Sequence, residues 1–125
     1  VPGEVYNWYQ GTLVHEVGHQ LDELVWNNYS QTAAWNTIVN ADKTLFNQIA
    51  SCMTALNDAE ACSTTDPLYA GKTNWDRFLT KMGLYGKTQG QINKEIFTYM
   101  FQRKSGSGTF PFMQYVENKL WTLST

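Results

Sequence analysis

The feature that most constrains this chain is the run His15-Glu16-Val17-Gly18-His19. Residues four apart on a helix lie one turn apart on the same face, so both imidazoles can reach one metal ion. Glu16 is turned by about 100° around the helix from His15 and therefore lies beside such an ion rather than among its ligands. The spacing predicts a helix that holds a metal on one face and carries a carboxylate next to it.

A catalytic zinc usually has three protein ligands and one open position. Both histidines of the chain lie in the motif, so the third ligand is expected to be a carboxylate. Glu95 borders the apolar stripe of a predicted helix, and an inward-facing carboxylate needs a partner, for which a zinc ion is one choice; the alternatives are a salt bridge and an edge side chain that reaches solvent. The other downstream carboxylates are explained by solvent, by a helix dipole or by a position off an apolar face: Asp42, Asp58, Glu60, Asp66, Asp76 and Glu117. We therefore predict one zinc ion held by His15, His19 and Glu95.

Two further positions of the motif helix carry expectations. Asp22 follows His19 by three residues, and it either accepts a hydrogen bond from a ligating histidine or ties down the helix; a solvated charge is the alternative. Gly18 costs about 0.5–1 kcal/mol relative to alanine in a helix, so a neighbouring segment is expected to approach it closely. An apolar face away from the histidines is expected to pack into the core. It comprises Leu13, Val14, Val17, Leu21, Leu24 and Val25.

The remaining chain predicts a mainly α fold in a single domain over residues 1–125, a length that suits one core. The motif helix should run from about 12 to 27, and residues 31–56 should form one long or two shorter helices with Ser30 as the N-cap. A polar loop covers 57–72. Further helices are predicted at about 74–84, 91–104 and 111–123. The aromatic-rich residues 5–10 could form one short strand.

Charge and cysteines limit the partners and the compartment. A net charge of -2 predicts no general attraction to nucleic acid or to an anionic membrane. No apolar run approaches the roughly 20 residues of a membrane span. Cys52 and Cys62 flank a polar stretch, which favours a local disulfide and an oxidising compartment; two free thiols are the alternative.

Three segments in this order resemble the catalytic domain of the anthrax lethal factor family, which includes the secreted Pro-Pro endopeptidases. They are His15-Glu-Val-Gly-His-Gln-Leu-Asp22, Tyr85-Gly-Lys-Thr88 and Glu95-Ile-Phe-Thr-Tyr-Met-Phe101, and the tail from Thr109 to Leu120 is similar to the family's closing helix. The family's members are zinc peptidases of the gluzincin kind. The resemblance implies a zincin-like helical catalytic domain with at most one or two short N-terminal strands, secretion, and a protein or peptide substrate.

Carried over by residue, the resemblance makes His15, His19 and Glu95 the zinc ligands, Glu16 the general base and Tyr85 the hydroxyl that stabilises the oxyanion. Tyr99, one turn after Glu95, is the competing phenol or a partner of that ligand. One alternative is a metal-binding or interaction domain with an inactive site, because few residues precede the motif helix to form a sheet; a strand at 5–10 beside the metal would favour the peptidase. Another is a zinc hydrolase of non-peptide amides.

Overall fold

The computed structural model describes the backbone of residues 2–104 and the side chains of residues 13–101. Its elements are α1 (Pro2–Leu24), the short 3-10 helix η1 (Tyr29–Gln31), α2 (Ala33–Gln48), α3 (Cys52–Leu56), α4 (Asn74–Lys81) and α5 (Gln89–Lys104). Within residues 2–104 there is no strand, and the predicted mainly α fold is confirmed. None of the described helices is long and apolar enough to cross a membrane. The helix predicted at 111–123 lies outside the described residues.

The strand predicted at residues 5–10 is wrong, because this segment belongs to α1. A strand pairs its backbone N–H and C=O groups with a neighbouring strand, and the described part of the chain offers none. A helix satisfies those groups within the segment itself. The motif helix therefore begins at Pro2, ten residues before the predicted start, and ends at Leu24.

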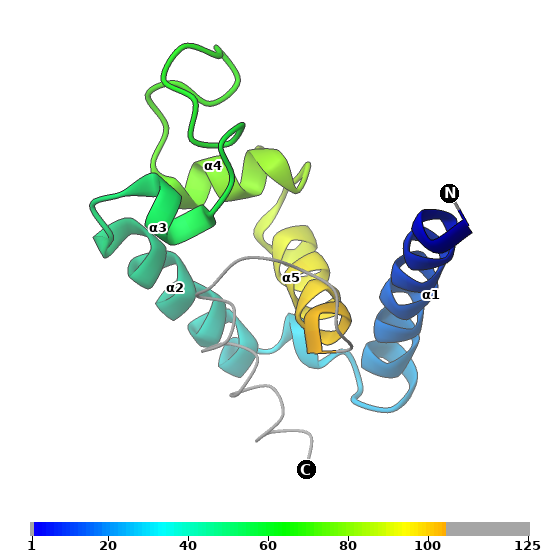
Figure 1. Ribbon diagram of the computed structural model, residues 1–125. Helices are drawn as coiled ribbons and strands as arrows, with labels where there is room; N and C mark the ends of the chain where they lie inside the picture. Colours follow the sequence, from blue (N-terminus) through cyan, green and yellow to red (C-terminus); the bar gives the residue numbers. More distant parts are fainter. Residues whose placement is uncertain (1, 105–125) are drawn as a thin grey trace.

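Helix α5 lies between α1 on one side and α2, α3 and α4 on the other (Figure 1). The core between α2, α4 and α5 is largely aromatic. Trp35 and Phe46 of α2, Phe78 of α4 and Phe97 of α5 are all fully buried. The Phe46 and Phe78 rings stack with centroids 5.3 Å apart, and Trp35 meets Phe97 edge-on at 5.1 Å. Burial of such side chains stabilises the fold by about 1.5–3 kcal/mol each, which anchors α5 firmly to this side.

Helix starts follow ordinary capping chemistry. The hydroxyl of Thr32 accepts a hydrogen bond from Trp35 N at the start of α2, and that of Thr73 accepts one from Asp76 N at the start of α4. The prediction of Ser30 as an N-cap is wrong, because η1 intervenes and Ser30 is buried against another partner.

The predicted loop at 57–72 is confirmed as turns without a helix. The predicted disulfide is also confirmed, since Cys52 and Cys62 are bonded. Beside it, the Arg77 guanidinium donates hydrogen bonds to the carbonyl oxygens of Ala61 at 2.9 Å and Ser63 at 2.8 Å. A covalent bond and a buried cation thus hold the loop against α4.

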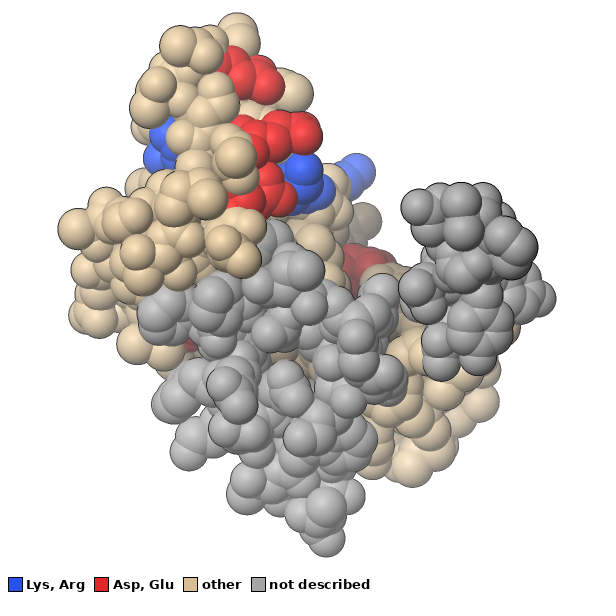
Figure 2. Space-filling view, in the orientation of Figure 1, with Lys and Arg blue, Asp and Glu red and all other residues tan. Residues whose placement is uncertain are grey.

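Charged side chains of both signs lie together over this loop (Figure 2). Lys81 pairs with Asp58 at 3.5 Å and with Glu60 at 3.3 Å. Both carboxylates therefore belong to an ion-pair network; Glu60 is exposed as predicted, whereas Asp58 is only partly exposed.

Candidate metal centre

The three predicted ligands meet where α1 packs against α5. His15 Nε2 lies 3.1 Å from Glu95 Oε2, and His19 Nε2 lies 3.3 Å from Glu95 Oε1. One donor atom from each of the three residues falls within 4.8 Å of the others. The structure therefore brings together residues up to 80 positions apart in the chain, in the combination predicted from the sequence.

The donor set fits zinc in chemistry and in spacing. Two imidazoles and one carboxylate are a common ligand set of catalytic zinc, and a tetrahedral ion with ligands at about 2.0–2.1 Å separates its donor atoms by roughly 3.3 Å. The two Nε2–Oε distances are close to that separation, and each histidine faces a different oxygen of Glu95. The side chains of His15, His19 and Glu95 are 27%, 16% and 35% exposed, so solvent or a substrate can reach the cluster.

The far nitrogen of His19 also has a partner. Thr98 Oγ1 lies 3.0 Å from His19 Nδ1, and the Thr98 side chain is fully buried. This bond orients the ring so that Nε2 faces Glu95, which is the usual role of a hydrogen-bonded neighbour of a metal-ligating histidine. Sequence reasoning missed Thr98, although its position three residues after Glu95 places it on the same face of α5.

Gly18 explains how α1 and α5 come this close. A Cβ atom at this position would lie 3.1 Å from Thr98 Cγ2 and 3.2 Å from Phe101 Cδ1. The predicted close approach of a neighbouring segment is confirmed, and the segment is the helix that supplies Glu95. A side chain at position 18 would therefore require Thr98 or Phe101 of α5 to move by a few tenths of an ångström.

Glu16 and Asp22 occupy different surroundings on α1. Glu16 is exposed and is not one of the three clustered donors, in keeping with its expected place beside the ion. Asp22 is fully buried and accepts hydrogen bonds from Ser30 N at 3.0 Å and Ser30 Oγ at 2.6 Å. Asp22 therefore fixes the end of the motif helix, which is one of its predicted roles, and it is not a solvated charge.

The two predicted tyrosines differ in exposure. Tyr85 is 52% exposed, and Lys72 Nζ lies 4.0 Å from its ring centroid. Its described contact is thus with a lysine rather than with the clustered ligands. Tyr99 is buried, with its ring 6.3 Å from that of Phe78. The role of oxyanion donor stays a prediction for both.

The apolar face of α1 does not pack into the core as predicted. Leu13, Val17, Leu24 and Val25 are 48%, 47%, 76% and 63% exposed. The side of α1 that contacts the rest of the described chain is instead the side that carries the histidines, Gly18 and Asp22. The prediction placed the core opposite the metal face, whereas α5 supplies both the third candidate ligand and the packing surface.

One carboxylate off the site also differs from expectation. The sequence predicts Asp42 off the apolar face of its helix, but the residue is fully buried in α2, and neither carboxylate oxygen has a hydrogen-bond partner. Burial raises the pKa of Asp42 to about 8, so the group is protonated at neutral pH. A neutral acid in the core is a poor ligand for a metal, which leaves Glu95 as the better candidate.

Comparison with protein-family models, with curated proteins and with solved structures found no match. The resemblance to the lethal factor family therefore rests on the motifs quoted above and on their order in the chain.

Proposed function

We propose that this protein is a zinc-dependent endopeptidase with its active site between α1 and α5. The observation that supports the proposal is the convergence of His15, His19 and Glu95 within 4.8 Å, with the exposed Glu16 on the same helix as both histidines. Glu95 lies 80 positions from His15 in the chain, so chance is a poor explanation for its carboxylate lying beside the motif. The disulfide agrees with secretion, which is part of the proposal.

Each residue has a defined task in the proposed reaction. His15, His19 and Glu95 would hold the ion, and Thr98 would keep the His19 ring in its orientation. A zinc ion there supplies a Lewis acid for the scissile carbonyl and lowers the pKa of water to about 7. Glu16 would accept a proton from the attacking water and pass it to the leaving amine nitrogen. Tyr85 is proposed as the oxyanion donor, and Tyr85→Phe compared with Tyr99→Phe would tell the two phenols apart.

A second candidate function is a metal-binding or interaction domain without peptidase activity. The helical backbone of residues 5–10 favours it, because a strand beside the metal is the expected support for a peptide substrate. The distances of 3.1 and 3.3 Å are also those of hydrogen bonds between imidazole and carboxylate, so the three side chains could share protons instead of an ion.

The first experiment measures the zinc content of the purified wild type, His19→Ala and Glu95→Ala. About one zinc per wild-type chain, sharply reduced in both variants, would support the site. The same preparations are then tested on a peptide library, with zinc-loaded Glu16→Gln as the control that should keep the metal and lose cleavage. Zinc binding without any cleavage would favour the second candidate, and no zinc binding at neutral pH would refute the peptidase and leave only an interaction domain.

A further inference from the structure

A cavity opens directly beside the candidate ligand Glu95. Its volume is about 420 Å³, within the range of small-molecule sites. The connection between α4 and α5 contributes Met82, Leu84 and Lys87 to its wall, and α5 contributes Gln91, Lys94 and Glu95. Because Glu95 belongs both to this wall and to the histidine cluster, a group held in the cavity lies next to the proposed reaction centre.

The charges around this cavity are not balanced. The Glu95 carboxylate faces His15 and His19, so it is already engaged. Lys94 pairs with Glu23 at 3.3 Å, an ion pair in which both side chains are more than 40% exposed. Lys87 is exposed and makes no ion pair among the described residues. Among the residues that the structure describes, the cavity therefore presents one cation without an ion pair and a second one that is only weakly held.

The same cavity has an apolar side. Leu84 is buried and Met82 is partly buried, and both lie on the wall that Lys87 continues. An apolar wall that ends in an ammonium group suits a side chain with a short methylene stem and a terminal carboxylate. Glutamate has this form, and aspartate is its shorter equivalent.

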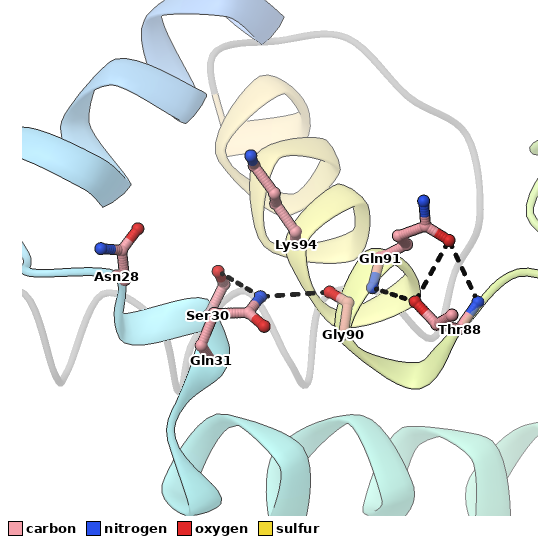
Figure 3. Close-up of a pocket in the computed structure, with 7 residues that line it drawn as sticks. All are labelled: Asn28, Ser30, Gln31, Thr88, Gly90, Gln91 and Lys94. Atoms are coloured by element: carbon pink, nitrogen blue, oxygen red, sulfur yellow. Dashed lines mark hydrogen bonds between the residues drawn. The ribbon is translucent and has the colours of Figure 1, made fainter.

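A second, polar cavity of about 320 Å³ adjoins the first, since Gln91 and Lys94 line both. It lies between η1 and the start of α5, where Gln31 Nε2 donates hydrogen bonds to Ser30 Oγ and to Gly90 O (Figure 3). Lys94 projects from α5 on the α1 side of this space. Both cavities therefore lie along the first turns of α5, and the first of them includes Glu95 in its wall.

We propose that the cavity between Lys87 and Lys94 is a substrate subsite that selects an acidic side chain of the peptide, with Lys87 as the main recognition residue. This inference rests on the proposed peptidase function. General electrostatic attraction does not account for such a preference, because the chain carries a net charge of -2 and repels acidic peptides at long range. The selectivity must come from the two lysines at the site.

The test uses zinc-loaded protein and pairs of peptides that differ by glutamate or glutamine at one position, scanned over both sides of the scissile bond. At one of these positions, kcat/KM for the glutamate peptide should exceed that for the glutamine peptide by about two- to fivefold, the range expected of exposed ion pairs. The preference should weaken in high salt. Lys87→Gln should abolish it, and Lys87→Glu should reverse it in favour of a lysine peptide. Lys43→Glu, an exposed charge on α2 away from both cavities, should leave it unchanged.

The outcomes separate this inference from the proposed function. Cleavage without preference for an acidic residue, or a preference that survives in Lys87→Glu, overturns the subsite and leaves the peptidase intact. Absence of cleavage refutes the peptidase. Binding of the same peptides, carrying a fluorescent label, to zinc-loaded Glu16→Gln protein is then measured by fluorescence anisotropy and tests the acidic site alone. Tighter binding of the glutamate peptide that is lost in the Lys87 variants supports the acidic site, whereas equal binding of both peptides overturns it.

Discussion

Replacement of Thr98 by valine tests whether the candidate metal centre depends on support from α5. The hydroxyl lies 3.0 Å from His19 Nδ1, and valine removes it while retaining a methyl group close to Gly18. Loss of a partner for a metal-ligating histidine typically weakens metal binding by about 10–100-fold, which corresponds to roughly 1.4–2.8 kcal/mol. The metal-free protein should lose no more than about 1.5 kcal/mol of unfolding free energy, the net value of one hydrogen bond.

The assay is competition for zinc with a chromophoric chelator at a fixed pH, because histidine ligands must be deprotonated to bind. Thr98→Ser retains the hydroxyl and should bind zinc within a few-fold of the wild type. Thr80→Val is the matched control, since its hydroxyl donates to the Asp76 carbonyl within α4, a helix that carries none of the proposed ligands. Unchanged zinc affinity in Thr98→Val, or an equal loss in Thr80→Val, would refute the assigned role.

Three other predictions follow from described contacts. Gly18→Ala should weaken zinc binding and lower the unfolding free energy by about 1–3 kcal/mol, because its Cβ meets side chains of α5. Gly90→Ala is the control, since the close neighbour there is only the flexible Gln31 side chain, and both quantities should change little. Denaturant melts and zinc titrations measure the two quantities. Asp42 stays protonated in the fold up to a pKa of about 8 but ionises near 3.8 in the unfolded chain. The unfolding free energy should therefore fall by up to about 1.4 kcal/mol for each unit by which the pH rises between these two values. Asp42→Asn should remove that slope in melts at several pH values, and a parallel slope in the variant would contradict the assignment. Reduction of the disulfide should lower the unfolding free energy by about 2–3 kcal/mol, measured with and without reductant.

The candidate site was more predictable than its surroundings. The i, i+4 spacing of the histidines fixes their common face by helix geometry alone, and the position of Glu95 beside an apolar stripe pointed inward. Thr98 could not be predicted in the same way, because a threonine on a buried helix face is common. Its role here depends on the hydrogen bond with His19, which the sequence does not reveal. That contact is made by tertiary packing between helices far apart in the sequence.

The errors in the fold have a shared origin. The aromatic character of residues 5–10 is compatible with a strand, but a strand requires a partner that no local pattern can supply. The apolar positions of α1 likewise indicate a face that avoids water, without indicating what covers it. In the described structure the small residue Gly18 and the buried Asp22 decide which side of α1 packs, and neither is hydrophobic.

The contact between α1 and α5 joins segments that lie far apart in the chain. Helix α1 meets the described body through α5 and η1, whereas the disulfide closes a loop of 10 residues elsewhere. An ion shared by His15, His19 and Glu95 would close a loop of 80 residues. Loop-closure entropy grows by about 0.6 kcal/mol per doubling of length, so these three doublings make the longer loop about 2 kcal/mol harder to close by chance. Zinc would then act as a long-range cross-link in addition to the contacts that already hold α1 against α5 and η1.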